Sequence, residues 1–350
     1  MTGERPSALA GAVDWELAAR TGVRLARPGP STTRWSAEAV VADLADASVR
    51  AEGPVRDVTG LADGQPVPAA RIVDRGGWIR AAAASMANLT GGDTGTEKRF
   101  LAGRPAGLQA GAMLAFLSSA ILGQYDPFTG EHGTLLLVAP NVVGVERALK
   151  VPPRDFRMWV CLHEVTHRVQ FSSAPWIADY MRETVATLGE VDEDSITDMM
   201  GRLTTVLRGR GSGQELAPEE RGIVGLLRAT QAPPQREALD RLLMLGTLLE
   251  GHADHVMDAV GPDIVPSVAR IRHAFDQRRA NRSNPLQRLV RALLGMDAKM
   301  AQYVRGKAFV DAVVETVGMA EFNTIWTGPD TLPLVGEIDT PQAWIDRVLG

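Results

Sequence analysis

The residues best suited to chemistry lie together near the middle of the chain, in the stretch His163-Glu164-Val165-Thr166-His167. On a helix, His163 and His167 lie one turn apart on the same face. Two imidazoles at this spacing can bind one zinc ion through bonds of about 2.0–2.1 Å. Glu164 between them can take a proton from metal-activated water without itself binding the metal. Chance produces this motif in roughly one of a hundred such sequences.

The neighbouring residues favour a helix over residues 155–172. Pro152 and Pro153 block a helix upstream, and Asp155 is a good N-cap residue. Apolar residues surround the motif, and the helical pattern ends before Pro175. We therefore expect the histidines and Glu164 on one largely buried helix. Two core histidines that only satisfy hydrogen bonds are the alternative interpretation.

A catalytic zinc site needs a third protein ligand besides two histidines. Glu250 and Asp254 share one face of a long predicted helix, residues 236–260. Glu250 follows an apolar run, where an ionised carboxylate is costly unless a positive charge lies opposite. Glu250 is therefore the preferred ligand, and Asp254 could accept the second ring N–H of a ligating histidine. The other candidates for the third ligand are Glu183, Glu190 and His252.

The composition is that of a globular protein. Apolar residues make up 45% and charged residues 23% of the 350 residues, which argues against disorder. The formal net charge of −5 gives no general reason to expect nucleic acid or an anionic membrane as a partner. We find no signal-peptide core and no apolar run of membrane-spanning length, so we expect a soluble, cytoplasmic protein. Cys161 is the only cysteine, and we expect it to be a buried apolar residue.

Most of the chain has the apolar periodicity of helices. The predicted helices are residues 7–21, 36–49, 78–89, 108–122, 145–149, 176–188, 196–207, 218–229, 236–260, 264–280, 285–294, 297–304 and 307–318. The short apolar run 134–139 predicts one buried strand. We therefore expect a mainly α (α+β) fold, with an N-terminal helical lobe over residues 1–95 and a catalytic region over residues 96–350.

The motifs resemble those of the zincin metallopeptidases, especially the branch with a glutamate as third ligand. His163-Glu164-x-x-His167 matches their first helix, and Glu250-Gly251-x-Ala253 looks like their second-helix glutamate motif. The whole chain also resembles a group of bacterial zincin-like proteins sometimes labelled zinc-dependent metalloproteases. This wider resemblance rests on Leu122-Gly123-Gln124-Tyr125-Asp126-Pro127, Leu135-Leu136-Leu137-Val138-Ala139-Pro140-Asn141, Leu249-Glu250-Gly251-His252 and Phe322-Asn323-x-x-Trp326. It implies a small sheet beside the active-site helix and a cleft between helices 155–172 and 236–260.

The resemblance also implies a zinc-dependent hydrolase that cleaves a peptide or small amide substrate. Zn²⁺ would be bound by His163, His167 and Glu250, with Asp254 supporting one of the histidines. Glu164 would act as the general base and later pass its proton to the leaving amine.

The resemblance further implies that the strand at residues 134–139 pairs with an extended peptide. A second oxyanion donor is usual in this chemistry, and the candidates are Tyr303, Tyr180, Tyr125 and His273. The alternative function is a catalytically silent scaffold that keeps the fold and binds a partner, and a helical protein without metal is a third interpretation.

Overall fold

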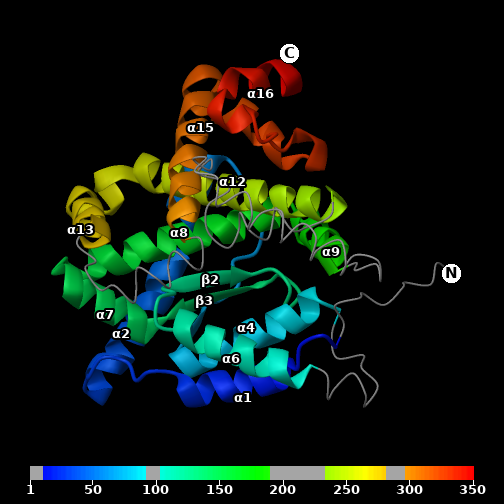
Figure 1. Ribbon diagram of the computed structural model, residues 1–350. Coiled ribbons are helices and arrows are strands. Elements are labelled where there is room, and N and C mark those ends of the chain that lie inside the picture. Colours follow the sequence, from blue (N-terminus) through cyan, green and yellow to red (C-terminus); the bar gives the residue numbers. More distant parts are fainter. Residues whose placement is uncertain (1–10, 92–102, 190–232, 281–295) are drawn as a thin grey trace, which may run out of the picture. The chain divides into compact units, whose positions relative to one another are not determined.

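A computed structural model describes residues 11–91, 103–189, 233–280 and 296–350 (Figure 1). Helices dominate these residues, and three short strands form one mixed sheet. The expected mainly α fold with a small sheet is therefore confirmed. The predicted helices at residues 196–207, 218–229 and 285–294 lie outside the described residues. Within the described part, we find no helix with the length and apolar character needed to cross a membrane.

A three-stranded sheet organises the first part of the chain, and β3 (Thr134–Val138) is its central strand. β3 pairs in parallel with β1 (Arg71–Val73) and antiparallel with β2 (Gly123–Asp126). The predicted strand at residues 134–139 is confirmed. The expectation that it pairs with a peptide is wrong, because both of its edges already carry a neighbouring strand.

Helices pack against both faces of this sheet (Figure 1). One group comprises α2 (Arg34–Arg50), α3 (Glu52–Thr59), α7 (Ala139–Leu149) and α8 (Pro153–Ser173), and the other α1 (Trp15–Leu25), α4 (Arg75–Leu89) and α6 (Arg104–Leu117). Leu135 and Leu137 pack with the first group, while Leu136 and Val138 pack with the second. Successive side chains of a strand point to opposite faces, so a strand buried on both faces is apolar throughout.

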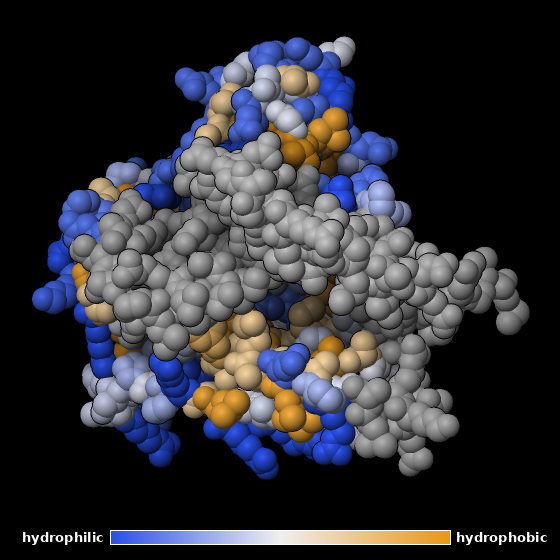
Figure 2. Space-filling view, in the orientation of Figure 1, coloured by the Kyte–Doolittle hydropathy of each residue, from blue (hydrophilic) through white to orange (hydrophobic). Residues whose placement is uncertain are grey.

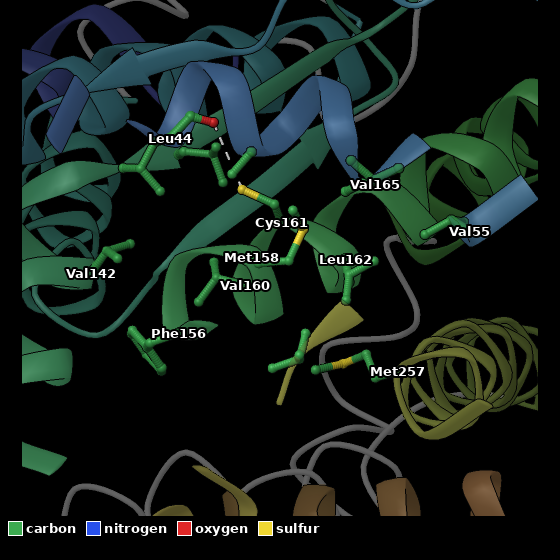
Figure 3. Packing of buried hydrophobic residues seen from close by; sticks show 14 of the residues in the cluster. Leu44, Val55, Val142, Phe156, Met158, Val160, Cys161, Leu162, Val165 and Met257 are labelled. Atoms are coloured by element: carbon green, nitrogen blue, oxygen red, sulfur yellow. Dashed lines mark hydrogen bonds between the residues drawn. The ribbon is translucent and has the colours of Figure 1, made fainter. Parts of the chain in front are cut away.

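The core between α8 and α2 surrounds the only cysteine (Figure 3). Cys161 is fully buried, and its Sγ lies 3.8 Å from the carbonyl oxygen of Leu44. Burial raises the pKa of the Cys161 thiol well above its ordinary value, because a thiolate is costly away from water. The prediction that Cys161 is a buried apolar residue is therefore confirmed.

The two faces of α6 differ in character. Gly111 faces α1 so closely that a Cβ there would lie 2.7 Å from the carbonyl oxygen of Ala18. On the outer face Leu108, Met113 and Phe116 are exposed, and hydrophobic residues gather over this helix in the space-filling view (Figure 2). The missing side chain at Gly111 thus lets α6 pack directly against the backbone of α1.

α8 begins at Pro153, two residues before the predicted start. Pro152 is the N-cap residue, and Pro153 takes the first helical position, where a backbone N–H is not needed. The prediction that Asp155 is the N-cap is therefore wrong. Its Oδ2 instead accepts a hydrogen bond of 3.0 Å from the backbone N–H of Ser267, directly before α13 (Val268–Ala280). Asp155 thus ties the start of α8 to the start of α13.

By their internal contacts the residues form two units. The first combines residues 1–182 with 253–277, and the second combines residues 183–252 with 278–350. The predicted boundary after residue 95 and the predicted cleft stay predictions. β1 precedes that boundary and β3 follows it, and the two strands pair in one sheet.

The first unit includes the C-terminal part of α12 (Pro233–Ile264), which contributes Val256 and Met257 to the core around α8. Within α12, Gly261 has a φ of 71° and interrupts the helical conformation before Pro262. α9 (Trp176–Gly189) confirms the helix predicted after the motif.

The second unit is helical in its described part. The helices predicted at residues 297–304 and 307–318 run without a break into α15 (Met296–Phe322), whose helical conformation is interrupted at Gly318, where φ is 85°. It is followed by the 3₁₀ helices η3 (Asn323–Trp326), η4 (Pro329–Thr331) and η5 (Glu337–Asp339) and by α16 (Pro341–Val348).

In the second unit, two glycines bring the backbones of α12 and α15 together. A Cβ on Gly251 would lie 2.3 Å from the carbonyl carbon of Gly306, and a Cβ on Gly306 would lie 2.2 Å from the carbonyl oxygen of Thr247. Neither glycine can be replaced without moving a helix. The glycine of the Glu250-Gly251 pair thus fixes how closely α12 and α15 pack.

We expect Gly251→Ala to destabilise the protein by about 1–3 kcal/mol or more, because the added methyl meets backbone atoms that cannot rotate away. Gly246→Ala on the same helix is the matched control, since a Cβ at that position would meet nothing within 4 Å. The control should be neutral or gain up to about 1 kcal/mol from helix propensity. Urea denaturation measures the free energy of unfolding of both variants. Equal values would show that Gly251 is not needed for the close packing of α12 and α15.

Candidate metal centre

His163 and His167 turn the same ring atom toward one another. Their Nε2 atoms lie 3.2 Å apart, and their rings are nearly perpendicular, with centroids 4.7 Å apart. Both side chains are partly buried on α8. The helix predicted around the motif is therefore confirmed. It brings the two imidazoles together, as expected for histidines four residues apart on a helix.

This separation fits two ligands of one zinc ion. Two bonds of about 2.0–2.1 Å that meet at the tetrahedral angle place their nitrogen atoms about 3.3 Å apart. The observed 3.2 Å between the Nε2 atoms is close to that value. The pair therefore needs little rearrangement to hold a metal.

The other ring nitrogens have different neighbours. The Nδ1 atom of His167 lies 2.9 Å from Oε1 of Gln170, which is fully buried. The Nδ1 atom of His163 lies 3.3 Å from the sulfur of Met257 on α12. Neither neighbour was predicted from the sequence. Gln170 could have been found, because it lies three residues after His167 on the same helix, whereas no local signal indicates Met257.

Glu164 is 7% exposed and lies against the beginning of β2. A Cβ on Gly123 would lie 2.6 Å from its Cγ and 2.9 Å from its Oε1. The strand leaves room for this carboxylate only because residue 123 has no side chain. A carboxylate in so confined a place keeps a defined position, which proton transfer requires.

Glu250 lies on α12, one turn before Asp254 and two turns before Met257. Within the described part of the chain, His163, His167 and Glu250 each offer one ligand atom, and these atoms lie within 4.8 Å of one another. Two neutral imidazoles and one carboxylate form a donor set that suits zinc.

The hydrogen bond found for Asp254 involves its backbone carbonyl group. The carbonyl oxygen of Asp254 accepts a hydrogen bond of 3.2 Å from Nη2 of Arg272. The expected support of a histidine by the Asp254 carboxylate stays a prediction, whereas Gln170 and Met257 lie at the two Nδ1 atoms.

The rival third ligands have other surroundings. Glu183 is exposed on α9, and Glu190 lies outside the described residues. His252 is fully buried in the second unit, where its ring stacks on Phe322 and meets Trp326 edge-on. His252 is therefore packed as an aromatic core residue.

The candidate oxyanion donors differ in their surroundings. The Tyr125 hydroxyl donates a hydrogen bond of 2.9 Å to the carbonyl oxygen of His132. Burial raises the pKa of Tyr125, and Asp126 adds to this while Arg168 opposes it. Tyr125 is therefore held as a neutral phenol by a backbone partner.

The remaining candidates gain no support as donors. Tyr180 meets the ring of Trp176 edge-on, and Nε2 of His273 lies 2.8 Å from the side-chain amide nitrogen of Gln277. The side chain of Tyr303 lies outside the described part. The second oxyanion donor stays open among these residues.

Comparison with known proteins places the chain in a family. Residues 13–345 match the family model of the zincin-like metallopeptidases. Among solved structures, a protein from Chloroflexus aurantiacus described as "a putative hydrolase with a novel fold" is 30% identical, with a TM-score of 0.64 over 96% of this chain and 98% of its own. The curated proteins gave no match. Because the family match spans nearly the whole sequence, the chain belongs to the zincin-like metallopeptidases.

Proposed function

We propose that this chain is a zinc-dependent hydrolase, a metallopeptidase that cleaves a peptide or small amide bond. The observation that carries the proposal is the pair of Nε2 atoms of His163 and His167, which face one another at 3.2 Å on one helix. Histidines that served packing alone would have no need to point their Nε2 atoms toward one another. The family match supports a hydrolase of the metallopeptidase kind.

The proposed zinc ligands are His163, His167 and Glu250, with water in the remaining position. The short distances among their ligand atoms support this set. The charge of Glu250 would balance half of the charge of Zn²⁺. A zinc ion held there supplies Lewis-acid chemistry, because it polarises a carbonyl group and acidifies water.

Glu164 is the proposed general base. Its carboxylate takes a proton from the attacking water and later delivers it to the amine that leaves. Its confinement against Gly123 supports this role, because proton transfer requires a fixed distance between donor and acceptor. Low exposure keeps bulk water from competing for the same oxygen atoms.

An extended substrate would align along β2 rather than β3. Among the described strands, β2 has a neighbour on one side only, so its other edge can accept hydrogen bonds from a peptide. β2 begins at Gly123, directly beside Glu164. A peptide added there would place its backbone near the proposed base.

We expect Glu164→Gln to lower hydrolysis by about 10²–10⁴-fold, because the amide cannot accept the proton. Zinc content and melting temperature should stay near wild type. Cleavage of a broad fluorogenic peptide library and metal analysis of the purified protein measure both. Undiminished cleavage would refute the general-base role, whereas a fully zinc-loaded wild type without turnover would favour a scaffold.

We expect Gly123→Ala to reduce turnover by about 100-fold while zinc stays bound, because the new methyl displaces the Glu164 carboxylate. Gly144→Ala on α7 is the control, since its Cβ would meet nothing within 4 Å. The same peptide library and metal analysis apply. Wild-type turnover in Gly123→Ala would show that Glu164 is not held by the strand.

We expect Glu250→Gln to weaken zinc binding by at least about 100-fold, because a neutral amide replaces a charged ligand. Glu237→Gln serves as the control on the same helix, since Glu237 forms an exposed ion pair with Arg241. Competition with a chromophoric chelator gives the zinc affinity. Equal affinities in both variants would remove Glu250 from the ligand set.

A further inference from the structure

The face of α8 that carries the two histidines continues to a third polar residue. Gln170 lies three residues after His167 and seven after His163, so all three share one side of the helix. Gln170 is fully buried, and its Oε1 lies 2.9 Å from Nδ1 of His167. Burial of an amide is costly unless its polar atoms are bonded, so this contact has a structural or chemical purpose.

We infer that Gln170 is the positioning residue of the metal site, an inference that rests on the proposed function. An amide oxygen can only accept a hydrogen bond, so it selects the His167 tautomer with the proton on Nδ1. That tautomer leaves the lone pair on Nε2, the atom that faces His163. Gln170 thus keeps His167 ready to bind a cation and fixes the plane of its ring.

The Nδ1 atoms of the two histidines face different neighbours. Nδ1 of His163 lies beside the Met257 sulfur at 3.3 Å, and a thioether is a weak acceptor. Nδ1 of His167 lies beside a strong acceptor, the amide oxygen of Gln170. Of these two neighbours Gln170 is the stronger acceptor, whereas Met257 places an apolar side chain beside the first ring.

A neutral acceptor suits this position for a physical reason. A carboxylate at residue 170 would also orient the ring, but as a buried charge it would destabilise the chain before metal is bound. The amide orients the ring without that cost. Gln170 is thus compatible with a protein that folds first and binds its metal afterwards.

The test compares zinc affinities of purified full-length variants by chelator competition. We expect Gln170→Leu to raise the dissociation constant for zinc by about 10–100-fold, the usual effect of losing a partner behind a ligating histidine. Gln170→Glu should retain an affinity within about threefold of wild type or tighter, because a carboxylate also accepts the Nδ1 proton. Metal-free Gln170→Glu should melt at a lower temperature than wild type.

Two controls separate positioning from packing. Met257→Leu should change the affinity by less than about threefold, because it removes only a weak acceptor. Thr166→Val removes another fully buried polar group, whose hydroxyl donates a hydrogen bond of 2.7 Å to the Leu162 carbonyl of its own helix, and should leave the affinity unchanged. Circular dichroism confirms the fold of each variant.

The outcomes distinguish the two proposals. If wild type binds zinc and Gln170→Leu binds it equally well, the role of Gln170 is refuted and the proposed function stands. A failure of Gln170→Glu to restore the affinity lost in Gln170→Leu would likewise refute it. If wild type binds no zinc, both proposals are overturned.

Discussion

Two imidazole nitrogens that face each other across 3.2 Å impose the main constraint on this protein. When both carry lone pairs, they repel one another until a cation or a shared proton lies between them. The fold must therefore hold His163 and His167 close enough to share a proton or a cation. Helix α8 provides this, because its backbone sets the spacing and its surroundings set the rotation of the helix.

The rotation of α8 about its own axis is fixed mainly by contacts of the sides that do not carry the histidines. Cys161, Leu162 and Val165 are fully buried in the core that α8 shares with α2 and the sheet. Arg168 is buried as well, and it pairs with Glu52 and donates a hydrogen bond of 2.6 Å to the carbonyl oxygen of Pro68. Buried ion pairs add little net stability because of desolvation, but their geometry is demanding. This pair therefore serves to orient the helix next to the face that carries His163 and His167.

At two places a glycine lets another element come close to a residue of the candidate site or to its neighbour in sequence. Gly123 lets β2 approach the Glu164 carboxylate, and Gly251 lets α12 pack against α15 directly beside Glu250. Neither glycine contributes a chemical group. Each sets a distance that any side chain would increase, so the precision of the candidate site depends on residues that carry no functional atoms.

The amino-acid pattern alone is enough to predict what lies within a single helix or strand. The helical repeat fixes His163, Glu164 and His167 relative to one another, and hydrogen bonds within the segment set that repeat. The same regularity makes the apolar run of β3 recognisable as a buried strand. The central place of β3 and the contacts of Gly123 with Glu164 and of Met257 with His163 became known from the folded chain alone. Contacts between elements depend on packing and register across long stretches of chain, and no local pattern encodes these.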